Sequence, residues 1–473
     1  MVRPSSARRR RRASPEPVVV FGAGYLGAAL VRQLVSSPHS EFVPVAILDD
    51  DPRKHHLRIM AVEVVGSLDD LASVVARTRA ATLVVAISQA SPALLARATE
   101  LAAPLGVTVK ALPPLGQVLR GTRQMSDLRD LEVEDILDRV PIDTDLEAMR
   151  NYLTGQRVLV TGAGGSIGSE LCAQISRFNP VALVMLDRDE SGLQDVQLRV
   201  SGHGLLTSPD VVLADIRDTE SLTHAFETHR PQVVFHAAAL KHLPLLQQYP
   251  DEAWKTNVLG TRNVLEAAMA VGTEIFINIS TDKAADPVSV LGHSKQLAER
   301  LTAHAAAEVQ RRYLSVRFGN VLGSRGSMLP LFTTMIERGG PITITHPDVT
   351  RFFMTIPEAC QLVIQAGSIG DPGEVLVLDM GEPVRILDIA NRLIELSGRT
   401  DIRIVFTGLR EGEKLNETLR SAGEFDVRPK HPLISHITTL RPLDPTHLDW
   451  PHFQKQWSAS VPNESTDAPG EQP

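Results

Sequence analysis

The chain has 473 residues, 43% of them hydrophobic, so it can bury more than one core and we expect two or three domains. Its formal net charge of −8 at pH 7 argues against a nucleic-acid-binding protein. The two cysteines, Cys172 and Cys360, lie far apart in apolar helical patterns. They predict buried thiols in a reducing, cytoplasmic setting rather than a disulfide or a metal site.

Residues 1–17 are rich in arginine, serine, alanine and proline, and this composition predicts a disordered tail. The apolar run that follows could pass for a secretory signal, but it carries a glycine fingerprint that a signal peptide does not need. No stretch offers the roughly 20 apolar residues of a membrane helix, so we expect no integral membrane span. The arginine tail would add only weak, salt-sensitive peripheral contact with anionic lipid.

Residues 18–117 show the alternation of strand and helix patterns that is typical of a small Rossmann-like domain with a parallel sheet. Gly22, Gly24 and Gly27 form a glycine turn, and Asp49 closes the next strand 22 residues past Gly27. No catalytic constellation accompanies this pattern, so a nucleotide-sensing or assembly role and a purely structural role both stay open. Residues 118–151 are charged and predict a linker.

The second domain, residues 152–445, begins with the signature around which the chain is organised. A strand-like run, Arg157–Thr161, leads into the sequence Gly162-Ala-Gly-Gly-Ser-Ile-Gly168 and then into a helical pattern. Such a turn brings backbone close to a pyrophosphate and aims helix N-terminal NH groups at it. Asp187 closes the next apolar run, where a carboxylate can accept the ribose hydroxyls. An ordinary strand–helix turn is the alternative, but strand, helix and acid in register favour a bound dinucleotide.

Further along, Asp215 ends a strand and can bond an adenine edge, and small residues end the strand pattern Val233–Ala239 where a cofactor would approach. Asp187 favours NAD, whereas Arg188 beside it could bind the 2′-phosphate of NADP, so the cofactor is NAD or NADP with a lean to NAD. The residues assigned to cofactor binding are Gly162, Gly165, Ser166, Ile167, Gly168, Asp187, Arg188, Asp215, Ile216, Ala237, Ala238 and Lys295.

The residues that suit acid–base chemistry follow the strand pattern Ile275–Ile279. Ser280-Thr-Asp-Lys283 lies at its end, and Leu291 and Lys295 lie four apart in the helix that comes next. In short-chain dehydrogenases that spacing is Tyr-x-x-x-Lys, and here the tyrosine position holds leucine.

Six segments together resemble the CapD-type polysaccharide-biosynthesis family of extended short-chain dehydrogenases/reductases. They are Thr161–Gly168, His236–His242, Ser280–Ala284, Arg317–Ser327, Thr345–Ala359 and Leu409–Leu415. The likeness covers nearly all of residues 18–445. It implies an α/β fold of two doubly wound, Rossmann-like domains, the second with a small C-terminal substrate-binding portion. Long members of the family usually begin with transmembrane helices and commonly carry methionine at the position of Leu291.

The resemblance implies a nucleotide-sugar 4,6-dehydratase that acts on a UDP-sugar, typically UDP-N-acetylglucosamine. Asp282 and Lys283 would serve as acid and base, Thr281 would polarise the 4-oxygen, and Lys295 would bind the nicotinamide ribose. A lysine base needs a pKa lowered by burial or by neighbours. The expected substrate-binding residues are Lys241, Asn257, Asn320, Arg325, Arg351, Arg410 and Glu413.

Two other functions stay open at this stage. A nucleotide-sugar epimerase would use the same cofactor chemistry, and a catalytically silent protein could bind a nucleotide sugar and regulate its partners. Retention of Asp282 and Lys283 favours the dehydratase over both. We further expect a homo-oligomer, and the polar composition of residues 446–473 predicts a largely disordered tail.

Overall fold

The computed structural model describes residues 15–37, 40–87, 90, 92–112, 128–130, 146–437 and 441–460. By internal contacts the chain divides into two compact units, Met1–Val140 with Arg392–Thr400, and Pro141–Asn391 with Asp401–Pro473. Most of the arginine-rich tail and of the expected linker, and residues 461–473, lie outside the described residues. No helix in the described part of the chain combines the length and the apolar character needed to span a membrane.

The first unit is a doubly wound sheet, as the strand and helix alternation predicts. Five strands run parallel in the order β4, β2, β1, β5, β6, and short antiparallel strands β3 and β7 flank them. The strands are β1 (Glu16–Phe21), β2 (Phe42–Leu48), β3 (Arg58–Ile59), β4 (Val62–Gly66), β5 (Thr82–Val85), β6 (Thr108–Ala111) and β7 (Arg129–Asp130). The helices are α1 (Tyr25–Ser36), α2 (Leu71–Thr78) and α3 (Pro92–Ala102).

The larger unit is built on an eight-stranded sheet in the order β10, β9, β8, β11, β12, β13, β18, β21, in which only β21 is antiparallel to its neighbour. The strands are β8 (Arg157–Thr161), β9 (Ala182–Asp187), β10 (Val211–Leu213), β11 (Val233–His236), β12 (Ile275–Ile279), β13 (Arg312–Arg317), β18 (Val375–Leu378) and β21 (Ile434–Ile437). Their apolar runs alternate between two cores: Val158 and Val160 of β8 face one, and Leu159 faces the other.

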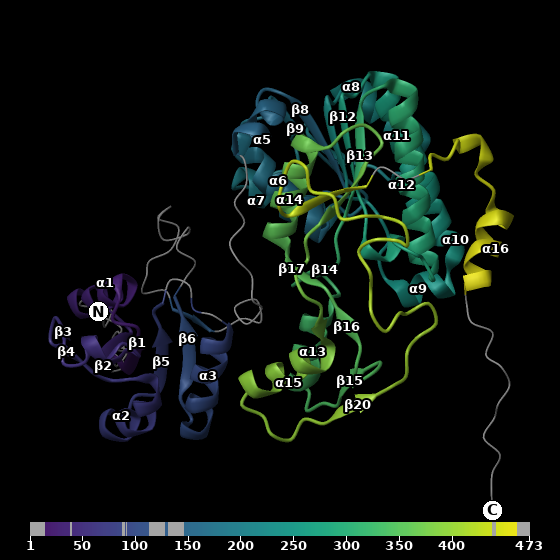
Figure 1. Ribbon diagram of the computed structural model, residues 1–473. Helices are drawn as coiled ribbons and strands as arrows, with labels where there is room; N and C mark the ends of the chain where they lie inside the picture. The colour runs from purple at the N-terminus through teal and green to yellow at the C-terminus, as the bar shows by residue number, and fades with distance from the viewer. Residues whose placement is uncertain are drawn as a thin grey trace, which may run out of the picture. The chain divides into compact units, whose positions relative to one another are not determined.

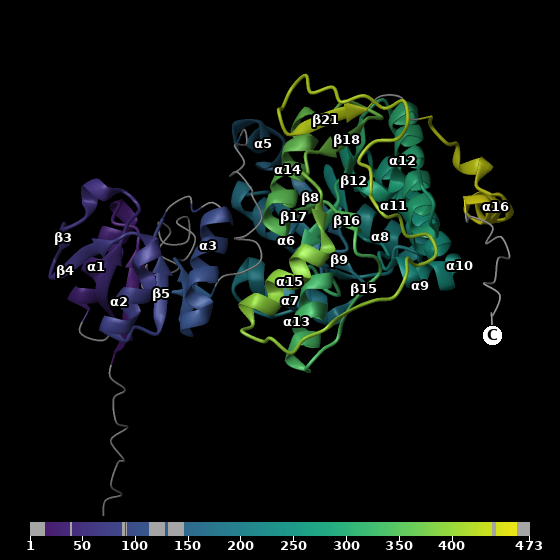
Figure 2. The ribbon, with the colours of Figure 1, turned by 60° about the horizontal axis from the view of Figure 1, so that its bottom comes forward.

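Helices cover both faces of this sheet (Figures 1 and 2). One core lies under α5 (Leu146–Leu153), α6 (Ser166–Ile175), α7 (Glu190–Ser201) and α14 (Ile356–Ile369). The other lies under α8 (Thr219–His229), α11 (Thr261–Val271) and α12 (Val290–Val309). The chain moves outward from β8 to β9 and β10 and then returns to β11 on the other side of β8. The carboxyl ends of β8 and β11 therefore form the switch point at which ligands of such sheets bind.

Short elements complete this unit beside the carboxyl ends of the strands. The paired strands are β14 (Asn320–Leu322) with β17 (Phe353–Thr355), β15 (Ile342–Ile344) with β20 (Ile404–Phe406), and β16 (Thr350–Arg351) with β19 (Val384–Arg385). The remaining helices are α9 (Leu243–Gln248), α10 (Pro250–Ala253), a π-helical stretch Trp254–Gly260, α13 (Met328–Glu337) and α16 (Trp450–Ser460). Helix α15 (Ile386–Leu396) begins in this unit, and its residues from Arg392 onward belong to the first unit.

Three expected boundaries differ from the structure. Strand β1 begins at Glu16, inside the predicted tail, and the predicted linker contains strand β7 and the start of α5. Residues 450–460 form α16, although a largely disordered tail was expected from residue 446. The aromatic residues of that segment explain the difference: Phe453 is buried and lies 5.3 Å from the ring of Trp254, and Trp450 lies 5.8 Å from the same ring. Polar neighbours in the sequence obscured this small apolar anchor.

Candidate active site

The glycine turn between β8 and α6 forms a cradle that only glycine permits. Gly162 has a φ of +69°, and a Cβ on it would lie 2.6 Å from the backbone nitrogen of Ala238. A Cβ on Gly168 would overlap the carbonyl oxygen of Gly162. Helix α6 begins directly after Gly165, with no side chain capping its NH groups. The backbone thus leaves a close approach to free helix N-terminal donors, which is what a pyrophosphate requires.

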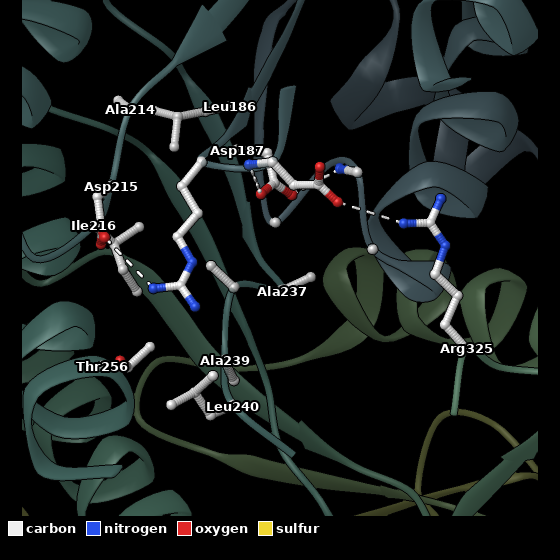
Figure 3. A pocket seen from close by; sticks show the side chains of 16 residues that line it. Leu186, Asp187, Ala214, Asp215, Ile216, Ala237, Ala239, Leu240, Thr256 and Arg325 are labelled. Carbon is white, nitrogen blue, oxygen red and sulfur yellow. Dashed lines mark hydrogen bonds and ion pairs between the residues drawn. The ribbon is translucent and has the colours of Figure 1, made fainter. Parts of the chain in front are cut away.

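A cavity of about 210 Å³ continues from this turn along the ends of β9, β10 and β11 (Figure 3). Asp187 is held in place because its carboxylate accepts the backbone NH of Gly164 at 2.8 Å and that of Asp189 at 2.9 Å. The expected cofactor residues that line this cavity are Gly162, Gly165, Asp187, Arg188, Asp215, Ile216, Ala237 and Ala238. In Figure 3, Asp215 and Arg325 lie at opposite ends, with Ala237 between them.

Arginine side chains surround Asp215 in this cavity. Arg217 approaches its carboxylate at 2.7 Å, and Arg188 at 3.5 Å. Burial alone would raise the pKa of Asp215, but the Arg217 hydrogen bonds outweigh burial and hold that pKa below its ordinary value. Asp215 therefore stays ionised as an acceptor. Arg188 is half exposed and only loosely paired, so its guanidinium stays accessible.

A second cavity, of about 570 Å³, adjoins the first and shares with it Gly162, Gly165, Ala237, Ala239, Leu240 and Arg325. It is bounded by the ends of β11 and β12, by the start of α12 and by the segment after β13. The predicted site residues that line it are Gly162, Gly165, Ser166, Ile167, Gly168, Ala237, Lys241, Thr281, Lys283, Lys295, Asn320 and Arg325. The structure thus brings residues from four segments that are distant in the sequence to the lining of one cavity.

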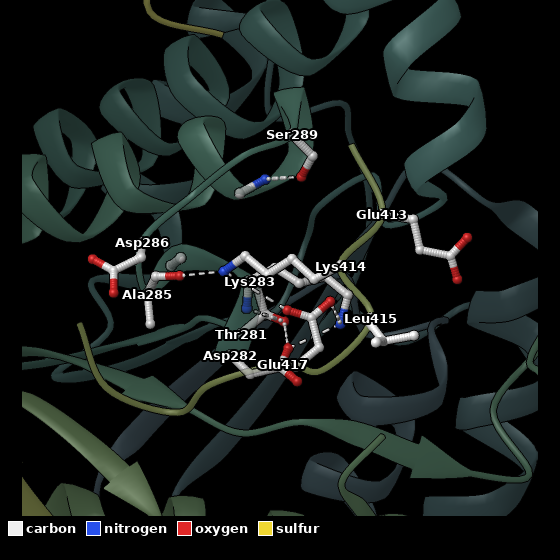
Figure 4. A network of polar contacts seen from close by, with 12 residues as sticks. Thr281, Asp282, Lys283, Ala285, Asp286, Ser289, Glu413, Lys414, Leu415 and Glu417 are labelled. Carbon is white, nitrogen blue, oxygen red and sulfur yellow. Dashed lines mark hydrogen bonds and ion pairs between the residues drawn. The ribbon is translucent and has the colours of Figure 1, made fainter. Parts of the chain in front are cut away.

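At the end of β12 a short 3₁₀ turn places Thr281, Asp282 and Lys283 side by side (Figure 4). The Thr281 hydroxyl donates to Asp282 Oδ1 at 2.8 Å, and Lys283 Nζ donates to the same oxygen at 2.9 Å. Lys283 Nζ also donates to Asn320 Oδ1 at 3.3 Å. Asp282 is fully buried and its Oδ2 has no hydrogen-bond partner among the described residues. Thr281 and Lys283 face the cavity, whereas Asp282 lies behind them.

The charge state of Lys283 differs from what a resting base requires. Burial lowers the pKa of Lys283, but the carboxylates of Asp282 and Glu417 outweigh burial, and the pKa is raised above the ordinary lysine value. Lys283 therefore does not have the lowered pKa that a lysine base needs. Lys283 rests as an ammonium ion and has to lose a proton before it can act as a base.

Burial lowers the pKa of two other lysines that line the cavity, Lys241 and Lys295. Lys295 lies on α12, it is 5% exposed, and burial lowers its pKa to about 8, although Glu299 opposes the shift. Leu291, one helical turn earlier, is also buried and lines the same cavity. The chain thus keeps the lysine of the Tyr-x-x-x-Lys pattern, but at the tyrosine position it has an apolar side chain with no proton to exchange.

Four of the expected substrate-binding residues either form contacts within the fold or do not line the cavity. The amide of Asn257 is fully buried and is used by both backbone groups of Leu240 and by Ser294, so its expected contact with the substrate is wrong. Arg351 is buried and donates to Glu413 at 2.8 Å, so these two neutralise each other outside the cavity lining. Arg410 is exposed and does not line the cavity.

Two further polar features were not predicted. Glu417 is 7% exposed and lies beside Lys283, with 3.7 Å between Oε1 and Nζ. It follows the Leu409–Leu415 motif on an irregular segment, where no periodicity marks a buried residue. The second feature joins Ser280, Glu299, Arg317 and Glu424: Arg317 is fully buried and contacts both glutamates at 2.7 to 2.8 Å. The sequence signal for this buried cluster is a charged residue inside a strand, Arg317, and another inside a helix, Glu299.

Fold and site together define an extended short-chain dehydrogenase/reductase: a doubly wound sheet, a Gly-x-x-Gly-x-x-Gly turn and a polar cluster at the switch point. Comparison with known proteins is more specific. Residues 158–439 match the model of a polysaccharide biosynthesis protein family, and residues 2–113 match that of a CoA-binding domain. The chain therefore belongs to the polysaccharide biosynthesis protein family, as the sequence motifs predicted.

Individual relatives agree with this assignment. The chain is 42% identical to the probable polysaccharide biosynthesis protein EpsC of Bacillus subtilis, over 91% of this chain and 72% of the relative. It is 41% identical to the capsular polysaccharide biosynthesis protein CapD of Staphylococcus aureus, over 86% and 69%. A UDP-glucose 4-epimerase of Rickettsia rickettsii is 36% identical, over 57% and 78%. Among solved structures, Pen from Bacillus thuringiensis matches 62% of this chain and 92% of its own, with 30% identity and a TM-score of 0.56.

Proposed function

We propose that the protein is a nucleotide-sugar 4,6-dehydratase that uses NAD or NADP and converts a UDP-sugar, UDP-N-acetylglucosamine first among the candidates, into a 4-keto-6-deoxy sugar. The observation that carries the proposal is the cluster of Thr281, Asp282 and Lys283, in which Thr281 and Lys283 line a cavity that also reaches the glycine turn and Lys295. Elimination needs an acid and a base within reach of one sugar, and this cluster supplies both.

The residues that would hold the cofactor have the geometry and the hydrogen-bonding groups that a dinucleotide requires. The glycine turn leaves room for a pyrophosphate, Asp187 presents a fixed carboxylate for ribose hydroxyls, and Ala237 and Ala238 leave the sheet edge open. When bound, the nicotinamide would take a hydride from carbon 4 of the sugar and return it to carbon 6. Lys295 would lie against the nicotinamide ribose, with its positive charge directed at the reacting end.

The substrate would occupy the larger cavity beside the cofactor. Lys241 and Arg325 bring positive charge to its wall, which suits a diphosphate. Lys241 Nζ donates to the carbonyl of Arg325 at 2.7 Å, and the Arg325 NH donates to Ser166 Oγ at 3.0 Å, so these residues form one connected wall. Asn320, which already accepts from Lys283, would contact the sugar itself.

Oxidation at carbon 4 needs a group that removes the hydroxyl proton, and Leu291 has none to offer. Thr281 and Asp282 form an alternative route, because the Thr281 hydroxyl already donates to the Asp282 carboxylate. The proton of the 4-hydroxyl would pass to Thr281 while the proton of Thr281 passes to Asp282. Asp282 then holds the proton that the departing 6-hydroxyl needs, so one carboxylate acts first as a base and then as an acid.

Lys283 would remove the proton at carbon 5, which the 4-keto group makes acidic. The same lysine would return a proton to carbon 5 after the hydride reaches carbon 6. An epimerase that inverts carbon 4 alone does not need groups aimed at carbons 5 and 6, and a silent binding protein needs neither Asp282 nor Lys283. These two residues therefore favour the dehydratase over both alternatives.

Incubation of the purified chain with UDP-N-acetylglucosamine tests the proposal by mass spectrometry. A dehydratase yields a product lighter by one water. A product of unchanged mass with altered configuration would identify an epimerase instead, and an unaltered substrate that binds would identify a silent protein.

A further inference from the structure

Glu417 is a buried carboxylate with no role in the site as described so far. Its Oε1 lies 3.7 Å from Lys283 Nζ, and its Oε2 has no hydrogen-bond partner among the described residues. Asp282 also contacts Lys283, and its Oδ2 likewise has no hydrogen-bond partner among the described residues. Two buried carboxylates thus lie beside one ammonium ion, each with an oxygen that accepts no hydrogen bond from the described residues (Figure 4). Buried acceptors are normally satisfied, so this arrangement calls for an explanation.

The number of protons released in the proposed dehydration accounts for the presence of two carboxylates. In the proposed dehydration, the 4-hydroxyl and the Lys283 ammonium each give up a proton before elimination begins. A carboxylate holds one proton, and Asp282 takes the one from the 4-hydroxyl through Thr281. The proton of Lys283 needs a second acceptor inside the site. Glu417 is the other carboxylate on Lys283.

We propose that Glu417 is a positioning residue of the acid–base site, whose carboxylate takes the proton that Lys283 releases and returns it at the end of each turnover. The proposal rests on the proposed dehydratase function. In the first step an N–H bond of Lys283 breaks and an O–H bond forms on Glu417. A closing of about 0.5 Å would bring the 3.7 Å separation of Oε1 and Nζ into hydrogen-bond range.

The remaining protons balance. The neutral amine of Lys283 takes the proton from carbon 5, and Asp282 returns its proton through the Thr281 hydroxyl to the 6-hydroxyl, which leaves as water. After hydride reaches carbon 6, Lys283 returns a proton to carbon 5 and recovers its ammonium form from Glu417. The net change is the loss of one water, whose hydrogens come from the 4-hydroxyl and the 6-hydroxyl.

The surroundings of Glu417 support this exchange. The charged groups that face it are Lys283 and Asp282 from the 3₁₀ turn, Arg351 from β16, and Lys414 from its own segment, at 4.0 Å. Burial raises the pKa of Glu417, and Asp282 adds to the effect, while Lys283, Arg351 and Lys414 oppose it; the net direction is upward. A carboxyl group with a raised pKa holds a proton more readily than a surface glutamate.

Glu417→Gln tests the proposal, because glutamine keeps the size and removes the proton acceptor. Without Glu417, Lys283 has to release its proton to solvent. At pH 7 we expect turnover to fall by roughly 100-fold and then to rise by about tenfold per pH unit, whereas the wild type stays nearly flat across neutral pH. Glu417→Asp, which keeps a carboxylate, should retain a flat profile. Glu411→Gln, an exposed glutamate of the same segment, is the matched control and should behave as wild type.

A second readout needs neither cofactor nor substrate. The pH dependence of Lys283 acetylation, followed by peptide mass spectrometry, reports its pKa in the free protein. Glu417→Gln should lower this pKa because one of the two carboxylates that raise it is gone. Glu411→Gln should leave the pKa unchanged.

Three results would overturn the role of Glu417. Wild-type turnover in Glu417→Gln shows that its carboxylate is not needed, and faster turnover shows that it only holds Lys283 in the charged form. Equal losses with flat pH profiles in Glu417→Gln and Glu417→Asp show a structural role. If the wild type releases no water from any UDP-sugar, the proposed function itself fails; if it does and Glu417→Gln matches it, only the Glu417 proposal fails.

Discussion

Leu291 is the residue at which this chain departs from the familiar short-chain dehydrogenase pattern. It is buried against the core under α12 and also lines the larger cavity. If Thr281 and Asp282 carry the proton of the 4-hydroxyl, the side chain at position 291 needs only to fill space. The cluster at the end of β12 thus accounts for an active enzyme without tyrosine.

Leu291→Met should therefore keep turnover within about twofold of wild type, since the two side chains are close in volume and neither titrates. Leu291→Tyr should raise turnover at most modestly, where the ring fits, because a second route for the 4-hydroxyl proton opens beside Lys295. Steady-state kinetics of both variants with the same UDP-sugar give the measurement. A loss of 100-fold or more in Leu291→Met would show that this side chain does more than fill space.

Lys295 gives a prediction about stability and pH. Its pKa is lowered to about 8 in the folded chain, chiefly by burial, whereas an unfolded lysine titrates near 10.4. Between these values the unfolded chain binds more protons than the folded one, so the contribution of Lys295 to stability rises with pH across that window. Relative to Lys295→Met, the free energy of unfolding of the wild type should increase from pH 8 to pH 10, by at most about 1.4 kcal/mol per pH unit. Urea unfolding of both proteins without cofactor measures the difference, and parallel curves would contradict the lowered pKa.

At the scale of elements, the polar chain behind the site ties β12, α12 and β13 together. The Arg317 guanidinium on β13 contacts Glu299 on α12 at 2.7 Å and Glu424 at 2.8 Å, and the Ser280 hydroxyl donates to Glu299 at 2.5 Å. Glu424 also accepts the NH of Ser421, whose hydroxyl accepts the NH of Asp286. The turn that carries Asp282 and Lys283 is thus held from both of its ends.

Arg317→Leu should destabilise the chain by roughly 3 to 5 kcal/mol, because it leaves Glu299 buried without its counter-charge. The double variant Arg317→Leu with Glu299→Gln should be less destabilised than the sum of the two single variants, since position 299 then carries no charge that needs Arg317. Chemical denaturation of all three proteins supplies the test. Additive effects would mean that the two side chains do not interact.

The elements were largely predictable from the sequence, and the reasons are physical. Buried parallel strands such as Ile275–Ile279 are continuous apolar runs, and the glycine turn at 162–168 has few alternative conformations. The residues that chain neighbours determine lie together as the sequence suggested: Thr281, Lys283 and Lys295 line one cavity, and their roles stay a prediction. Asn257, Arg351 and Glu417 were not, because each is determined by a partner far away in the sequence: Leu240, Glu413 and Lys283. Charge type alone does not reveal whether an arginine meets a ligand or a glutamate.

For the molecule as a whole, α16 contributes to the larger unit, although a largely disordered tail was expected there. Phe453 of α16 is 1% exposed and packs against Trp254, which begins the π-helical stretch. Phe453→Ala should lower the free energy of unfolding by about 3 kcal/mol, because it removes a buried aromatic ring and leaves a cavity that the neighbouring side chains do not fill. Thermal unfolding measures the loss, and Gln454→Ala on the same helix is an exposed comparison. An unchanged unfolding temperature in Phe453→Ala would show that α16 does not stabilise this unit.

The central claim is that Asp282 and Lys283 remove water across carbons 5 and 6 of a UDP-sugar. Turnover in deuterium oxide, followed by NMR and mass spectrometry, tests it most directly, because the proton on carbon 5 is exchanged only if that bond is broken. The wild type should yield a 4-keto-6-deoxy product that has lost one water and carries deuterium at carbon 5. Asp282→Asn and Lys283→Ala should each lower product formation by roughly 100- to 10,000-fold. A wild-type product without deuterium at carbon 5, or wild-type labelling and turnover in Lys283→Ala, would contradict the claim.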